Sequence, residues 1–493
     1  MIFKYKIYFF LSLFLFFLPQ IVFSQFNFSP DLEIIYNDLL KLKIKPAQSN
    51  IKDILKNNPK NGIAIYLDNY ADVINLLVTE DEKMYDQLIK NEYSRIKEIK
   101  QLDKNSPYYL FIQAEIKLQW SVVKLKFGDE MNAFFDLQRA YKLLEENNRK
   151  FPEFLPQKKT LGLLHIIIGS VPDKYHWIVN LFGMKGSIKQ GLEEMNEVRN
   201  KKNTFQLESE ILFQLMNGYV IKSDSSTLES LQKLYSRNTD NLLICFLLAN
   251  VAHKQGESEM ALPLLHNCPR GSDYIAFNFL EYLKGDMYLR KGNYNNSIFF
   301  FEKFLKNTKG KNFLKDSYYK LLLSKWLSGN DYKSLQSYVI KIKKSGKEIT
   351  EVDKYAQHFA ENNLEPNKIL MKERLYFDGG YYDKAFEEFK NINENSFINQ
   401  KEKAEYYYRN GRLLHKTNNI TNAIDNYLKA IKLSEDEQYY FGASAALQVG
   451  YIYQKLKEKE KAKFYFNKSL SFKNHEYKNS IDSKAKAALE ELK

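Results

Sequence analysis

Proline, glycine and cysteine are scarce in this sequence. Its 493 residues include only 11 prolines, 20 glycines and 2 cysteines. Because proline and glycine interrupt helices, their scarcity favours long helical runs joined by short turns. Charged residues make up 27% of the chain and hydrophobic residues 44%, which is the balance of a folded protein rather than a disordered one.

Catalytic and metal-binding motifs are also missing. The sequence holds no His-Glu-x-x-His motif, no G-x-x-x-x-G-K-[ST] phosphate loop and no G-x-S-x-G element. His165 and His176 stand among apolar residues without a cysteine or carboxylate pattern beside them, so we interpret them as core or capping histidines. The glycines of Gly183–Gly191 fit a tight connection between helices. We therefore expect no enzymatic activity, no metal site and no cofactor.

The net charge of +13 at neutral pH raises the question of a nucleic-acid partner. Lysine, however, greatly outnumbers arginine, and the lysines alternate with glutamates, as in the Lys-Leu-Lys-Glu-Lys-Glu-Lys run at 455–461. This alternation is typical of a solvated helix face. We therefore predict no nucleic-acid partner.

The first residues have the pattern of a secretory signal. Lys4 and Lys6 precede an apolar run at 7–18, and Val22 and Ser24 stand before a cleavage site that would release residues 1–24. An uncleaved membrane anchor is the alternative, although the run is short for a membrane span. No cysteine lies near the cleavage site, so we expect no lipid anchor. We expect an exported protein, periplasmic or outer-membrane-associated if the source is a Gram-negative bacterium.

The second half of the chain repeats one skeleton of small and aromatic residues. Its four positions are spaced by 3, 9 and 4 residues, as in Gly450, Tyr453, Ala462 and Phe466. The same spacing recurs in three further units, which are Gly411, Leu414, Ala423 and Tyr427; Gly285, Tyr288, Ser297 and Phe301; and Ala249, Ala252, Ala261 and Leu265. Ala385 and Phe389 supply half of a fifth unit. Helical hairpins need small residues where their two helices cross and aromatic residues to fill the space between hairpins.

The skeleton resembles the tetratricopeptide repeat family, most closely in 404–470. It departs from the family in placing Tyr407 and Ala446 where a tryptophan is usual, and in lacking the closing proline. The resemblance implies an all-α fold, a right-handed superhelix of helical hairpins in which each repeat packs only on its neighbours. It also implies a concave groove, lined by the first helix of each repeat, that binds a protein or peptide partner.

Six residues are the candidate contacts in that groove. They lie three before, one after and four after the first small position of the last two units, and they are Tyr408, Arg412, His415, Leu447, Tyr451 and Gln454. Aromatic rings give rigid contact area and arginine pairs with carboxylates, so the set suits a peptide. The alternative is that these are ordinary solvated positions. The family's carboxylate-clamp pattern is absent, so binding of chaperone tails is not carried over.

A second, weaker resemblance involves the block at 160–191 and the Ala249 unit. Its short glycine-based motif resembles a eukaryotic tetratricopeptide-like family linked to inclusion-body clearance. Because this block is apolar and rich in glycine, it is the alternative site, for a carrier of a small apolar or glycan ligand. Our leading expectation is a non-enzymatic scaffold or assembly factor. A free protein and one attached to a membrane complex are both compatible with the sequence.

The chain divides into four parts in this interpretation. They are a signal peptide (1–24), an N-terminal domain of degenerate hairpins (25–200), middle repeats (201–346) and C-terminal repeats with a capping helix (347–493). Cys245 and Cys268 fall in one repeat, which we expect to place one on each helix. They are either a disulfide clipping that hairpin or two buried free thiols.

Overall fold

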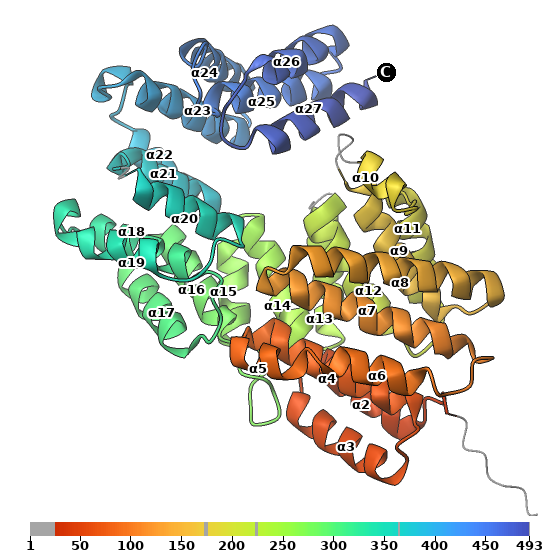
Figure 1. Ribbon diagram of the computed structural model, residues 1–493. Coiled ribbons are helices and arrows are strands. Elements are labelled where there is room, and N and C mark those ends of the chain that lie inside the picture. Colours follow the sequence, from red (N-terminus) through yellow and green to blue (C-terminus); the bar gives the residue numbers. More distant parts are fainter. Residues whose placement is uncertain (1–24, 172–175, 222–224, 363–364, 493) are drawn as a thin grey trace, which may run out of the picture.

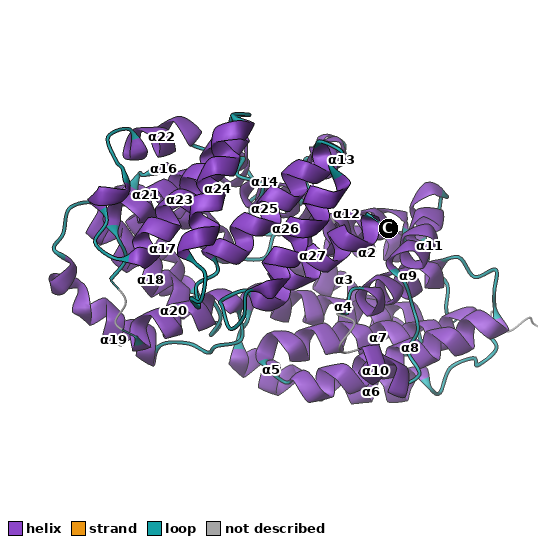
Figure 2. Cartoon of the chain, turned by 90° about the horizontal axis from the view of Figure 1, so that it is seen from above, coloured by secondary structure: helices purple, strands orange, loops and turns teal. Residues whose placement is uncertain are grey.

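The chain is a continuous succession of helices. The computed structural model describes residues 25–171, 176–221, 225–362 and 365–492 (Figure 1), and the expected signal segment lies outside them. Within these ranges helices and their connecting loops make up the whole structure, and no strand occurs (Figure 2). The prediction of an all-α fold is confirmed. In the same ranges, no helix has both the length and the apolar character needed to cross a membrane.

The N-terminal part contains packed helices of very different lengths. They are α2 (Pro30–Leu40), α3 (Ile44–Asn57), α4 (Gly62–Thr79), α5 (Glu82–Leu88), α6 (Asn91–Ile99), α7 (Pro107–Phe127), α8 (Glu130–Lys150), α9 (Pro156–Gly169), α10 (His176–Leu181) and α11 (Ile188–Asn200). Helices α7 and α8 are the longest in this part. Ser106 caps α7, Pro107 opens it and Gly128, with φ of 88°, ends it. Proline at the first position and a left-handed glycine after the last are the sequence features that fix a helix's two ends.

The middle part contains shorter helical pairs. Its elements are α12 (Gln206–Met216), the π-helix η2 (Asn217–Ile221), α13 (Ser225–Ser236), α14 (Leu242–Lys254), α15 (Ser258–His266), α16 (Phe279–Lys291), α17 (Tyr294–Asn307), α18 (Leu314–Leu327), the 3₁₀ turn η3 (Tyr332–Leu335) and α19 (Gln336–Lys344). One hydrophobic core extends from Phe26 to Leu321, so the N-terminal and middle helices share buried surface. The boundaries near residues 200 and 346 stay predictions.

The C-terminal part forms an arch over the rest of the molecule (Figure 1). Its elements are α20 (Glu351–Glu361), α21 (Lys368–Gly379), α22 (Tyr382–Phe389), the 3₁₀ turn η4 (Glu394–Ser396), α23 (Gln400–Lys416), α24 (Ile420–Leu433), α25 (Phe441–Lys455), α26 (Lys459–Ser471) and α27 (Lys478–Glu491). Helices α24 and α26 lie on the outside of the arch, and α23, α25 and α27 lie on the side that faces the other helices.

The repeat skeleton acts through contacts inside each hairpin. A Cβ built on Gly450 would lie 2.5 Å from the ring of Phe466, and one on Gly411 would lie 2.7 Å from the ring of Tyr427. Gly285 stands in the same relation to Phe301, at 3.0 Å. The ring of the second helix therefore rests on the glycine of the first. The sequence predicts that these rings fill the space between hairpins. In the structure each ring also occupies the space that a side chain at the glycine of its own hairpin would fill.

Candidate partner-binding surfaces

Two of the six predicted groove residues are buried instead of lining an open groove. Tyr408 is 8% exposed and Leu447 is 3% exposed. The ring of Tyr408 packs against Tyr427, Tyr440 and Phe441. Both side chains are thus largely covered by the protein itself, and their role in partner binding stays a prediction.

Arg412 is held by the protein's own side chains. Its Nη2 donates to Asp378 Oδ1 at 3.0 Å, and its guanidinium carbon lies 4.0 Å from the centre of the Phe377 ring. The arginine thus joins α23 to the end of α21. A substitution of Arg412 would therefore disrupt the contact between α23 and α21, so its effect would not report on partner binding alone.

The other three predicted residues are half-buried at the surface. His415 packs edge-on against Tyr427, and burial followed by the charge of Lys455 lowers its pKa. Tyr451 packs on Phe466, and Gln454 donates to Glu491 on α27 at 3.1 Å. Their role in partner binding stays a prediction.

A different group of partly exposed residues forms a surface in the C-terminal part of the chain. We call Tyr355, Arg374, Tyr440 and Tyr477 the arginine–tyrosine surface. They come from α20, α21 and the residues that precede α25 and α27. Tyr440 and Tyr477 meet edge to face, with ring centres 5.1 Å apart, and Tyr477 is half exposed. The guanidinium carbon of Arg374 lies 6.0 Å from the ring centre of Tyr355.

Arg374 keeps much of its hydrogen-bonding capacity. Its Nε lies 3.8 Å from Asp378 Oδ2, beyond hydrogen-bond range, and a third of its side chain is exposed. Burial opposes its charge, but Tyr355, Tyr440 and Asp378 hold its pKa well above the ordinary value. Sequence reasoning missed this residue because Glu373 takes the place of the small residue that marks the first helix in the neighbouring units. Arg374 corresponds to Arg412 and Tyr451 in those units.

The inner side of the arch also faces the middle helices. Burial and the charge of Lys484, on α27, lower the pKa of Lys254, on α14. The two lysines are exposed and lie close enough for their charges to interact. The last helix, α27, therefore lies near α14 of the middle part.

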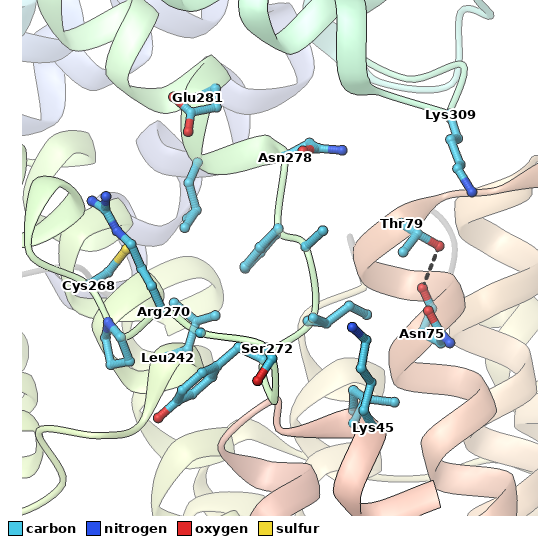
Figure 3. A pocket seen from close by; sticks show the side chains of 18 of the residues that line it. Lys45, Asn75, Thr79, Leu242, Cys268, Arg270, Ser272, Asn278, Glu281 and Lys309 are labelled. Atoms are coloured by element: carbon cyan, nitrogen blue, oxygen red, sulfur yellow. Dashed lines mark hydrogen bonds between the residues drawn. The ribbon is translucent and has the colours of Figure 1, made fainter.

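A second candidate site is a cleft of about 670 Å³ between the N-terminal and middle helices (Figure 3). One wall is formed by residues of α3, α4 and α5. The other is formed by the 268–278 segment and α16, and Lys303 and Lys309 also line the cleft. We call it the basic cleft, because Lys45, Arg270, Lys284, Lys303 and Lys309 line it. Its volume is in the range of ligand-binding cavities.

The loop that forms one wall of the basic cleft is tied to its surroundings. The backbone N–H of Ile275 donates to the carbonyl of Leu42 at 3.0 Å, and the hydroxyl of Tyr274 donates to the carbonyl of Asp240 at 2.7 Å. Lys41 extends the tie with an ion pair of 2.7 Å to Asp240. The wall is therefore preformed. No local pattern could reveal it, since Ile275 and Leu42, like Lys41 and Asp240, lie about two hundred residues apart in the chain.

A family model described as "Tetratricopeptide repeat" matches residues 282–309, 404–437 and 443–475. The chain contains tetratricopeptide repeats. The three matched segments correspond to the Gly285, Gly411 and Gly450 units, and their hairpins are α16–α17, α23–α24 and α25–α26. Repeats of this family are protein-interaction scaffolds. The Ala249 unit, outside the matched segments, forms the pair α14–α15.

Several solved structures match this chain, each at low sequence identity and with a low TM-score. One, described as Naa15/Naa10 bound to HypK-THB, is 13% identical with a TM-score of 0.27, and the match covers 94% of this chain but 66% of that one. A Cut9–Hcn1 hetero-tetramer of APC/C is 13% identical (TM-score 0.26; 95% and 100% covered), and the P58(IPK) TPR domain is 13% identical (TM-score 0.22; 84% and 97% covered). No curated protein sequence gives a significant match.

The glycines of the alternative carrier site serve helix packing in this repeat protein. A Cβ on Gly162 would lie 2.7 Å from the carbonyl oxygen of Gly191, so α9 and α11 cross with their backbones in contact. His165 is buried and its Nδ1 lies 2.6 Å from Glu194 Oε2, which supports the interpretation as a core histidine. His176 begins α10. A ligand in this block stays a prediction.

Both cysteines are buried free thiols. Cys245 lies on α14, but Cys268 lies just beyond the end of α15, so the expectation of one cysteine on each helix is wrong for Cys268. The Sγ atoms donate to the carbonyls of Leu264 and Leu265, at 3.6 and 3.3 Å. Of the residues that the structure describes, no group of three or more His, Cys, Asp or Glu could hold a metal ion.

Proposed function

We propose that this protein is an exported, non-enzymatic scaffold or assembly factor that binds a segment of a protein partner on the arginine–tyrosine surface. The observation that carries the proposal is Arg374. It is a cation with a long ion pair, its side chain is one-third exposed, and it lies near Tyr355 and Tyr440, which belong to other elements of the C-terminal part. The repeats support a scaffold role, since repeats of this family act in protein interactions. The arginine–tyrosine surface is the proposed binding site.

The composition of the surface suits a peptide segment. Tyrosine and arginine are enriched at the residues that dominate binding energy in protein interfaces. Tyrosine has few rotatable bonds, so it loses little entropy on binding. Arg374 could form two parallel hydrogen bonds with a carboxylate of the partner. The surface is contributed by α20, α21 and the residues that precede α25 and α27, so the contacts would be spread over several hairpins.

The test is site-specific photocrosslinking in intact cells. A photoreactive amino acid replaces Tyr477 of the arginine–tyrosine surface, and in a matched control it replaces Phe464, which is 62% exposed on α26. We expect a discrete adduct from position 477 and none from position 464. The same adduct from both positions, or from position 464 alone, would contradict the proposed surface.

Arg374→Ala, combined with the crosslinker at 477, tests the role of the arginine. We expect the adduct to fall at least about fivefold, because loss of a hot-spot side chain costs more than about 1 kcal/mol. Arg237→Ala, which removes an exposed arginine after α13, is the control and should leave the adduct unchanged. Circular dichroism of both variants checks that the helices remain.

Export is tested separately by N-terminal sequencing of the protein recovered from its source. We expect the mature chain to begin at Gln25. A mature protein that still begins at Met1 would contradict the proposed cleavage and would favour the uncleaved anchor. This result would leave the crosslinking test unaffected.

A further inference from the structure

The basic cleft carries an excess of positive charge that its own acids do not balance. Among the described residues that line it, five are cations and one, Glu281, is an acid. The carboxylate of Glu281 is shared, since Lys303 lies 3.1 Å from it and Lys284 lies 3.4 Å from it. Lys309 pairs with Asp81 at 2.9 Å, at the edge of the cleft.

Two of the cations, Arg270 and Lys45, do not take part in the ion pairs just described. Arg270 donates to the backbone carbonyl of His266 instead of to an acid. Lys45, the second residue of α3, is exposed. The side chain of Lys284 is only 6% exposed, so binding of an anion would remove little further water from it. An anionic ligand would therefore meet cations that are positioned and incompletely neutralised.

The cations are spread around the cleft rather than gathered at one point. Figure 3 shows Lys45, Arg270 and Lys309 on different sides of it, with Asn278 and Glu281 between them. One small anion cannot reach all of these groups. An extended ligand with several negative charges can, because its charges could follow the cations from one side of the cleft to the other.

The remaining lining favours a peptide over a nucleic acid. Gln48 and Asn75 offer amide groups that can hydrogen-bond a peptide backbone, and Ile275 and Phe277 are half-buried apolar residues that can contact a side chain of the peptide. Lysine supplies four of the five cations, whereas single-stranded nucleic acids are usually bound on stacked aromatic rings with arginine.

We propose that the basic cleft binds an extended, acidic segment of a protein partner. This site shares no residue with the arginine–tyrosine surface, and the proposal does not depend on the function proposed for that surface. Acidic side chains of the segment pair with Lys45, Arg270 and the Lys284–Lys303 pair, and an apolar side chain contacts Phe277.

The experiment measures binding of a short fluorescein-labelled peptide of alternating glutamate and leucine to the full-length protein at low salt. The same peptide with lysine in place of glutamate is the charge control. We expect the acidic peptide to bind and the basic peptide to bind at least tenfold more weakly. Equal binding of the two peptides, or no binding of the acidic one, overturns the proposal.

Two variants place the peptide in the cleft. Lys45→Glu reverses an exposed charge at the second position of a helix, where an acid is favourable for the helix, so the fold should be retained. Lys401→Glu makes the same change at the second position of α23 and is the matched control. We expect a loss of affinity on the order of tenfold for Lys45→Glu, and no change for Lys401→Glu.

Ala276→Trp tests the cleft by volume instead of charge. Ala276 is an exposed lining residue of the 268–278 segment, so the larger side chain can occupy the cleft without entering the core. We expect it to abolish peptide binding. Equal affinities of Lys45→Glu and Lys401→Glu overturn the proposal. So does saturable binding of inorganic phosphate or single-stranded DNA that depends on Lys45 while the acidic peptide does not bind.

Discussion

Gly256 and Gly380 meet backbone to backbone, although they are more than a hundred residues apart in the chain. Gly256 belongs to the turn between α14 and α15, and Gly380 to the turn between α21 and α22. A Cβ on Gly380 would overlap the carbonyl oxygen of Gly256. Tyr381 strengthens the junction by donating to Glu259 Oε1 at 2.7 Å. The C-terminal arch is therefore anchored to the middle repeats by a contact that only glycine permits.

Gly380→Ala should weaken this junction. Gly380 has φ of 84°, so alanine meets backbone strain as well as the overlap with Gly256. We expect a loss of stability of about 2–4 kcal/mol. Gly183→Ala is the control, because Gly183 has φ of 72° and no atom within 4 Å of an added Cβ, so alanine there should cost only about 1 kcal/mol. Urea unfolding of both variants gives the comparison, and equal losses would contradict the junction.

The two cysteines give a second prediction. Burial raises the pKa of Cys245 to about 11, and both thiols donate to backbone carbonyls. The thiolate is the reactive form, so a thiol reagent at pH 8 should react slowly with the native protein. After denaturation without reductant, the same reagent should react with both thiols. Titration of fewer than two thiols, restored to two by prior reduction, would show a disulfide instead.

The repeat skeleton was readable from the sequence because it depends on short distances along the chain. Gly411 and Tyr427 belong to one hairpin, so a fixed spacing brings ring and glycine together. The same spacing predicts the face of α23 on which Tyr408 lies. It could not predict the burial of Tyr408, since that depends on how closely Tyr440 and Phe441 of the next hairpin approach.

The arginine–tyrosine surface and the basic cleft could not be predicted from the sequence, for a different physical reason. Arg374 was hidden because a buried glutamate, Glu373, replaces the small residue that marks its repeat. Lys45 and Lys303 line the same cleft, one wall of which is a loop whose backbone is hydrogen-bonded to Leu42. No periodic sequence pattern predicts this contact. Local spacing thus predicts hairpins, whereas long-range packing decides which of their residues remain accessible.

A buried lysine in the N-terminal part gives a third prediction. The side chain of Lys159 is 2% exposed, and its Nζ lies 3.0 Å from Glu115 and 2.8 Å from Glu208. Burial lowers the pKa of this lysine, but the two carboxylates more than offset the effect and raise it. The hydroxyl of Tyr70 adds a hydrogen bond of 2.9 Å to Glu208. One lysine thus neutralises part of the charge of two buried acids.

Lys159→Met should leave both carboxylates buried without their cation. We expect a loss of about 3–5 kcal/mol at neutral pH, because removing one partner of a buried ion pair is strongly destabilising. Lys158→Met is the matched control. Lys158 pairs with Glu197 at 2.6 Å on the half-buried side of the same helix, and this change should cost about 1 kcal/mol or less. Similar urea midpoints for the two variants would refute the role assigned to Lys159.

The buried glutamate in the Arg374 repeat predicts an unusual pH dependence. Glu373 is 1% exposed, its Oε2 has no hydrogen-bond partner, and Arg409 lies 3.9 Å away. Burial raises its pKa to about 7, against an ordinary value of 4.5. Between pH 4.5 and pH 7 the folded protein therefore holds a proton that the unfolded chain gives up. Stability from this group is fully present below pH 4.5 and is lost as the pH rises through 7.

Glu373→Gln keeps the shape of the protonated acid but cannot ionise. At about 1.4 kcal/mol per pKa unit, the variant should be more stable than the natural protein above pH 7 by on the order of 3 kcal/mol, and the difference should vanish toward pH 4.5. Glu387→Gln, at an exposed carboxyl of the neighbouring helix α22, should leave the profile unchanged. The measurement is the free energy of unfolding in urea from pH 4.5 to pH 8. Parallel profiles for Glu373→Gln and the natural protein would mean that the carboxyl ionises as freely in the fold as in water, and that Arg409 neutralises it fully.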